Sequence, residues 1–238
     1  LKQVMTYGSS PTTQQSGKII KESLAEVVHD FNPSVKLKVD TLEYSDQLSF
    51  NNIFAHAYLE NDLLKIRNAN VSYGESYIES NIDLDISHQD ILPFDLFLEL
   101  NNIDIAHTLE HFDYFNVPQL ESAKQINGNV WFDLDLSSII DLNNNDFITS
   151  KTIADITVKL EDVIIEDLET INNVAEKIRR VDRFNVLKFA PIESHINIEG
   201  KRIVVEETEV QSNAIHAFVE GTIDNNSSEH LWISIPVK

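Results

Sequence analysis

Apolar and polar residues alternate along most of this sequence, and no other feature limits its possible folds as much. Around residue 83, for example, Ile82 and Leu84 flank Asp83. Because successive side chains of a strand point to opposite faces of the sheet, such segments predict half-buried strands with one apolar and one wet face. The alternation recurs in six segments: 78–86, 92–100, 130–136, 156–160, 215–223 and 231–237. The chain is therefore predicted to be mostly β (α+β), a curved antiparallel sheet of repeated meanders.

Three other segments have helical spacing instead. Apolar residues recur every three or four positions in 18–31, 104–115 and 162–184. The last segment has acids early and bases late, which complements a helix dipole. The two later helices, of about 12 and 23 residues, are too short to cover eight or more strands. Two or three amphipathic helices are expected at an end or edge of the sheet. The apolar face that remains is either a closed core or a groove for an apolar ligand.

A possible internal repeat divides the chain. The segment 48–56 (LSFNNIFAH) reappears as 187–195 (LKFAPIESH), and the same offset of 139 residues aligns apolar positions up to the end of the chain. This predicts a polar tail plus helix in 1–33 and a β-rich domain in 34–238. Within that domain, a meander in 48–98, a helix and strand insert in 99–186 and a second meander in 187–238 follow one another. Chance is the alternative, since two alternating patterns align easily.

Composition excludes several functions. A net charge of −21 disfavours electrostatic binding to nucleic acids and to anionic membranes. The absence of cysteine removes disulfides and thiolate chemistry, and six glycines leave little material for phosphate-binding loops. No apolar run approaches the ~18 residues of a transmembrane helix. Because the sequence begins at Leu1 without a signal peptide, it is expected to be a fragment.

Two short motifs could carry metal chemistry. His107, Glu110 and His111 spell H-x-x-E-H, the inverted zinc-peptidase motif, in which two imidazoles one turn apart bind zinc. The expected peptidase scaffold is missing, so we interpret both histidines as lying on the solvent face of a helix. The segment 141–146 (DLNNND) has the oxygen density of a calcium loop but lacks its glycine and its final glutamate, which favours an Asn-rich turn. His56 and His195 occupy equivalent repeat positions and are expected to pack alike. No enzyme activity, metal or cofactor is predicted.

The order of features from residue 161 onward resembles the C-terminal region of the AsmA-like proteins of Gram-negative envelopes. The stretches that carry this resemblance are 187–192 (LKFAPI), 196–205 (INIEGKRIVV), 210–214 (VQSNA), 219–224 (VEGTID) and 233–237 (ISIPV). The stretches 100–105 (LNNIDI) and 126–130 (INGNV) resemble the same family. The resemblance implies the periplasmic part of an inner-membrane-anchored protein related to TamB and the bridge-like lipid-transfer proteins. It also implies a role in phospholipid transport or outer-membrane homeostasis.

A groove that carries acyl chains would be formed by the apolar residues of the alternating segments. The predicted groove residues are Ile82, Leu84, Phe94, Leu96, Phe132, Leu134 and Val219. The expected ligand is a phospholipid or another acyl-chain molecule. The alternative is a non-catalytic interaction module that pairs its sheet edges with an envelope protein partner.

Overall fold

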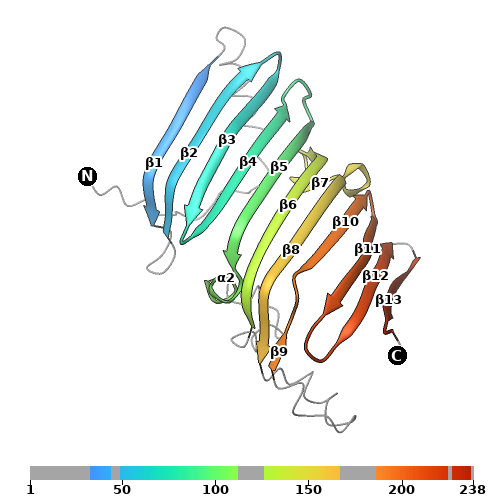
Figure 1. The fold of residues 1–238 in the computed structure, drawn as a ribbon. Coiled ribbons are helices and arrows are strands. Elements are labelled where there is room, and N and C mark those ends of the chain that lie inside the picture. Colours follow the sequence, from blue (N-terminus) through green and yellow to red (C-terminus); the bar gives the residue numbers. More distant parts are fainter. Residues whose placement is uncertain (1–32, 44–48, 112–125, 167–185, 225–226, 237–238) are drawn as a thin grey trace.

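One open antiparallel sheet makes up nearly all of the structure, a computed structural model that describes residues 33–43, 49–111, 126–166, 186–224 and 227–236 (Figure 1). The sheet has 13 strands in the order β1-β2-β3-β4-β5-β6-β8-β10-β11-β12-β13, with β7 paired to β6 and β9 to β8. This confirms the mostly-β fold class. The strands are β1 (Ser34–Glu43), β2 (Ser49–Glu60), β3 (Leu63–Tyr73), β4 (Ser76–Asp85), β5 (Ile91–Asp104), β6 (Ile126–Asp141), β7 (Asp146–Phe147), β8 (Ile153–Glu166), β9 (Val186–Lys188), β10 (Ile192–Glu199), β11 (Arg202–Gln211), β12 (His216–Asp224) and β13 (Ser227–Ser234).

The helical part of the described chain is small. It consists of α2 (Ile105–His111), which lies against the ends of β5 and β6, and a single 3₁₀ turn, η4 (Thr149–Lys151). The Asp104 carboxylate caps α2 by accepting a hydrogen bond of 2.6 Å from the backbone N–H of His107. The helix expected in 104–115 is thus present as far as residue 111, and residues 112–115 lie outside the described ranges. The helix expected in 18–31 and the tail in 1–32 lie outside them too.

The helix predicted to begin at Asp162 is wrong over its first five residues, because β8 continues to Glu166. Asp162 adopts a left-handed conformation with φ of 53°. Such a residue lets a strand bulge and changes the phase of its alternation. After the bulge, Ile165 faces Ile126 across the β6–β8 pair, so the strand keeps its apolar face. The remaining residues of that predicted helix, 167–184, lie outside the described ranges.

Several bulges of this kind interrupt the ladder. Register shifts occur in β3 between Ile66 and Ala69 and in β5 between Leu100 and Ile103. Asn68 and Asn102 lie within them, with φ of 50° and 55°. Asparagine tolerates this conformation better than most residues, so it replaces the glycine that many bulges use. Bulges increase the local twist and bend of a strand, in keeping with the curvature of the sheet.

The two proposed repeats have the same strand pairing. Leu64 pairs with Leu84 in β3–β4, and at an offset of 139 residues Ile203 pairs with Ile223 in β11–β12. The bulge between Ile66 and Ala69 also has its counterpart between Val205 and Thr208. The last strand of each repeat, β5 and β13, departs from this rule. Ile82 pairs with Leu96, whereas Gly221 pairs with Leu231, four residues before the position that the offset of 139 predicts. A shift by an even number of residues keeps the apolar side chains on the same face.

The buried apolar residues lie at the ends of the strands and not at their middle. One group lies at the end of the sheet next to α2, here called the α2 end: Tyr73, Ile103, Leu109, Val163, Leu187 and Ala217. A second group lies at or near the opposite end, here called the β7 end: Leu59, Ile86, Leu142 and Ala154. The central part of the sheet therefore holds no buried core of its own among the described residues.

Candidate functional site

The candidate site is the apolar face of the sheet, which the strand register makes continuous. Residues that pair directly across an antiparallel ladder point to the same face. One such row crosses eight strands from β3 to β12 and contains only aliphatic side chains: Ile66, Ile82, Leu96, Leu136, Ala154, Ile198, Ile203 and Ile223. With strands about 4.8 Å apart, the row extends for about 34 Å.

All seven residues predicted from the sequence lie on this face. Leu84 pairs with Phe94, Ile82 pairs with Leu96, and Leu134 pairs with Leu98 in the neighbouring row. Phe132 pairs with Leu100 on the same side. Val219 lies farther away, on β12. It is two residues from Gly221 and so points to the same face, and direct strand pairs across β11, β10 and β8 put Gly221 in the same row as Leu134. The structure thus brings six of the seven close together and places Val219 near the β13 edge.

The exposure of these seven side chains is intermediate: none is buried and none is fully exposed. A closed β-sandwich would bury such residues almost completely. In the described part of the chain, no second sheet lies over the middle of this face, and α2 lies only at its end. The middle of this face is therefore partly exposed to solvent, in contrast to the buried apolar clusters at the strand ends.

Several polar side chains on this face form hydrogen bonds within the protein. The Thr208 hydroxyl donates to Ser194 Oγ at 2.8 Å, and the Ser76 hydroxyl donates to the carbonyl of Asn102 at 2.8 Å. Ser138 Oγ lies 2.8 Å from Thr152 Oγ1. From β2 to β6 and in β8, β10 and β12, no described register position on this face carries a charged residue. The face therefore presents hydrocarbon and few groups that require water.

Aromatic side chains border the face at both ends. At the α2 end, the Tyr73 ring lies 5.3 Å from the His107 ring and 5.8 Å from the Phe50 ring. Burial, together with the charge of Asp104, raises the pKa of Tyr73. At the β7 end, Phe94 and Phe147 have ring centroids 5.8 Å apart. These contacts limit the length of the open region along the strands.

The opposite face of the same strands is strongly acidic. Glu99 lies directly between Glu79 and Asp133, and Asp83 pairs with Asp95. Like charges in direct opposition destabilise a sheet. Arg67 partly offsets this, because its guanidinium forms a salt bridge with Asp83 and donates to the carbonyl of Ile82 at 3.0 Å. The hydrogen bond to Asp83 also raises the pKa of Arg67.

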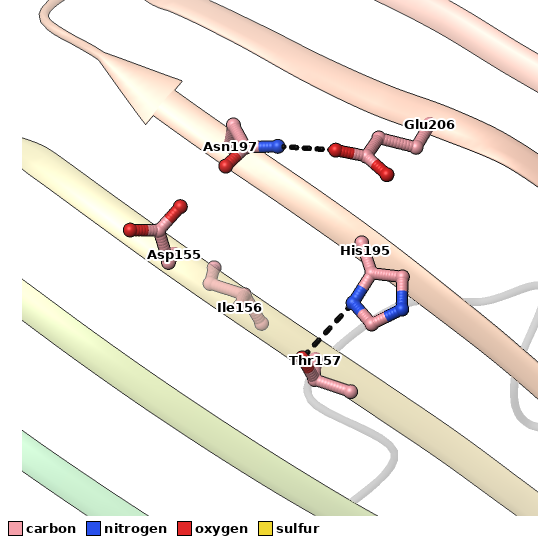
Figure 2. A pocket seen from close by; sticks show the side chains of 6 residues that line it. All are labelled: Asp155, Ile156, Thr157, His195, Asn197 and Glu206. Carbon is pink, nitrogen blue, oxygen red and sulfur yellow. Dashed lines mark hydrogen bonds between the residues drawn. The ribbon is translucent and has the colours of Figure 1, made fainter.

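A shallow hollow on this acidic face, with a volume of about 340 Å³, is lined by Asp155, Ile156, Thr157, His195, Asn197 and Glu206 (Figure 2). Its side chains are largely paired with one another. Asn197 Nδ2 donates to Glu206 Oε1 at 3.0 Å, and Thr157 Oγ1 lies 3.1 Å from His195 Nδ1. The imidazole is half exposed and close to Glu193 as well. This hollow has the character of a solvated strand surface and not of a reaction site.

His56 and His195, which were expected to pack alike, have similar surroundings. His56 Nε2 lies 2.8 Å from the Ser34 hydroxyl on β1, and His195 Nδ1 lies near the Thr157 hydroxyl on β8. In both cases the hydroxyl comes from the neighbouring strand on the N-terminal side of the sheet order, β1 beside β2 and β8 beside β10. Both imidazoles are on the acidic face, so their shared role is cross-strand contact.

The two motifs with possible metal chemistry gain no support from the described residues. His107 is exposed and stacks on Tyr73, whereas the side chains of Glu110 and His111 lie outside the part described. Asp141 binds its own turn: its carboxylate accepts from Asn143 N at 2.9 Å and from Asn144 Nδ2 at 3.0 Å. No group of three possible metal ligands occurs among the described side chains.

Comparisons with known proteins do not assign this chain to a family. No family model, no curated protein and no solved structure matches this chain. Within the described ranges, no helix has the length and apolar character needed to cross a membrane. The functional argument therefore rests on the geometry of the apolar face.

Proposed function

We propose that this chain is a non-catalytic lipid-holding protein whose apolar sheet face binds the acyl chains of phospholipids. The observation that carries this proposal is the eight-strand aliphatic row, in which six side chains have intermediate exposure, Ala154 is buried and Ile223 is exposed. A bilayer core about 30 Å thick holds two acyl chains end to end. A row of about 34 Å is thus long enough to accept one acyl chain along its length.

Binding would be passive. Each methylene removed from water contributes about 0.8 kcal/mol, so ten buried methylenes contribute about 8 kcal/mol before the costs of association. No polar contact is required for such binding, in keeping with the uncharged register positions described on β2 to β6, β8, β10 and β12. Because the energy is spread over many contacts, the ligand can move along the face without a large barrier.

The phospholipid class and the cellular location come from the order of sequence elements, which resembles AsmA-like proteins. That resemblance suggests a periplasmic protein that takes part in lipid transport or outer-membrane homeostasis. The half-open apolar face agrees with this class of protein, since transport along a sheet needs a surface that solvent or lipid can reach.

The test is native mass spectrometry with lipid extraction on protein purified from a Gram-negative host. Phe132→Asp places a charge on the apolar face and is expected to remove copurifying phospholipid. Trp131→Asp is the matched control, because Trp131 immediately precedes Phe132, lies on the acidic face and is directly opposite Lys159. Lipid bound equally to both variants, or absent from the unmodified protein, would contradict the proposal. Circular dichroism confirms that each variant is folded.

A second candidate function, a structural module that pairs its sheet edges with a partner, is favoured by the exposure of the terminal strand. In β13, Leu231, Trp232 and Ile233 are 66%, 52% and 62% exposed, and Ile235, just after the strand, is 68% exposed. β1 carries Lys36 and Lys38 between its apolar residues, which protects an edge, whereas described β13 side chains include no lysine. Ile233→Lys would abolish edge pairing but leave lipid binding at the centre of the sheet intact.

A further inference from the structure

We infer that copies of this chain associate head to tail, with β13 of one copy paired to β1 of the next, so that their apolar faces form one surface. This inference deepens the second candidate function above, because it names a second copy of the chain as the partner. β1 and β13 are the two ends of the strand order, and among the described residues neither has a strand on its outer side. An edge of this kind presents backbone N–H and C=O groups with which another chain can pair.

The directions of the two edge strands determine how two copies can join. Of the 13 strands, all but β7 and β9 lie in the main strand order, so ten antiparallel pairs lie between β1 and β13. An even number of reversals leaves β1 and β13 parallel. A second copy that continues the sheet with its apolar face on the same side therefore places its β1 parallel to β13. Mixed sheets of this kind are common among large sheets.

The exposed apolar residues of the two edges match in this arrangement. In β1, Val35 and Leu37 are 61% and 50% exposed, and Leu231 and Ile233 of β13 are exposed to a similar extent. The strand register places all four on the apolar face. A parallel register that puts Leu231 beside Val35 of the next copy also puts Ile233 beside Leu37. Both contacts would remove hydrocarbon from water.

On the acidic face, the same register puts Lys36 of the next copy beside Trp232, and both side chains are exposed. Glu220 pairs directly with Trp232 and is exposed too. The backbones of β12 and the added β1 would lie about 10 Å apart, a span that a lysine and a glutamate side chain can bridge. The protein already contains a similar contact, because Lys159 Nζ lies 5.6 Å from the ring centroid of Trp131, directly opposite it in β6–β8.

Charge makes the other edge pairings less favourable. Pairing β1 with β1 of another copy would bring Lys36 and Lys38 of both copies together, and like charges in opposition destabilise a sheet. Pairing β13 with itself offers no lysine or arginine to Trp232. A head-to-tail contact uses different surfaces of the two copies, so it can repeat and form open oligomers.

The apolar face would continue from one copy to the next. Leu231 belongs to the row of Leu134, which ends at β13. Val35 of the next copy leads through Ala57 to Ile66, the first residue of the aliphatic row. The passage of acyl chains between copies is a consequence that rests on the proposed lipid binding.

The test is sedimentation velocity of the delipidated full chain at about 150 mM NaCl, with two matched variants that each block one edge. Ile233→Lys blocks β13 and Leu37→Lys blocks β1, and both place a lysine at the same proposed contact. A single strand pair is a small interface, so the unmodified protein is expected to form dimers and longer oligomers only above about 100 µM. Each variant alone is expected to stay monomeric there. An equimolar mixture is expected to form a 1:1 dimer and nothing larger, because one intact β1 and one intact β13 remain.

A charge exchange tests the register. Lys36→Glu is expected to weaken association about tenfold, because it places an acid near Glu220 of the neighbouring copy. Adding Glu220→Lys to the same chain is expected to restore association. Circular dichroism confirms that each variant is folded. Association that Lys36→Glu leaves unchanged would overturn the proposed register.

Three results would overturn head-to-tail pairing. Association of Leu37→Lys alone, as strong as that of the unmodified protein, would mean that β13 pairs with itself. The second result is a mixture of the two variants that stays monomeric, and the third is an unmodified protein that is monomeric well above 100 µM. Lipid binding is measured separately by native mass spectrometry, so the two proposals fail independently.

Discussion

Replacing one buried and one half-exposed leucine by alanine distinguishes an open apolar face from a closed core. Leu187 is the reference, since its side chain is 0% exposed at the α2 end. Leu96 is the test, because it belongs to the aliphatic row, where it is flanked by Ile82 and Leu136, and is neither buried nor exposed. Both substitutions remove the same atoms, so the change in β-propensity is similar in the two variants.

The expected losses differ because only one site can form a cavity. Leu187→Ala removes a fully buried side chain and leaves an empty volume, which typically costs about 3–5 kcal/mol. For Leu96→Ala, fully burying a leucine is worth about 1.5–3 kcal/mol, and roughly half of this is lost from a half-buried position. Water can occupy the vacated space, so no cavity cost is added. The expected loss is about 1 kcal/mol.

The assay is urea unfolding of delipidated protein, followed by circular dichroism and tryptophan fluorescence where the two transitions coincide. Addition of phosphatidylcholine is expected to stabilise the unmodified protein and, less strongly, Leu96→Ala, because ligand binding to the folded state raises its stability. A loss of about 3 kcal/mol or more for Leu96→Ala would mean that its surroundings are a closed core. In that case the lipid-binding proposal would be wrong.

Three further predictions concern the sheet itself. In the urea assay, Gly128→Ala is expected to lower the free energy of unfolding by at least about 2 kcal/mol, since φ is +139° and a Cβ would lie 3.0 Å from the Glu161 carbonyl oxygen. Gly74→Ala is the comparison: φ is +58° but the space around it is open, so the expected loss is about 1 kcal/mol. Glu99→Gln keeps the hydrogen bond from Asn101 and removes a charge between two acids, so it should stabilise the protein by about 0.2–1 kcal/mol at low salt, with the gain shrinking in 1 M NaCl. The folded state raises the pKa of Tyr73, so the contribution of this group to stability is present below pH 10 and decreases as pH rises through the folded pKa. The free energy of unfolding should therefore fall less between pH 10 and 11 in Tyr73→Phe than in the unmodified protein.

The alternation of the sequence was sufficient to predict the sheet and the face on which each groove residue lies. Ile82, Leu84, Phe94 and Leu96 share a face because their segments keep a period of two without interruption. The sequence missed β1, although Val35 and Leu37 alternate with Lys36 and Lys38 there. It also predicted a helix where β8 continues, because Ile164 has helical spacing to Leu168 and Ile171, whereas in the structure the left-handed Asp162 shifts the alternation of a continuing strand.

What the alternation cannot give is the relation between distant strands, which depends on bulges. The pattern in β3 breaks between Ile66 and Ala69, three residues apart, yet both side chains face the apolar side. Read without the bulge, Ala69 and Val71 would be assigned to the acidic face.

The same bulges connect the shape of the sheet with the proposed function. A strictly alternating meander would keep its apolar residues on one face but would lack the local bends that bulges introduce. Asn68 in β3 and its counterpart Glu207 in β11 bend the two halves at equivalent positions, and the phase change there keeps the aliphatic rows continuous. A continuous, bent and half-open apolar surface therefore follows from a few residues that interrupt the pattern. Holding an acyl chain requires such a surface, whereas a module that acts only through its edges has no need for an open centre.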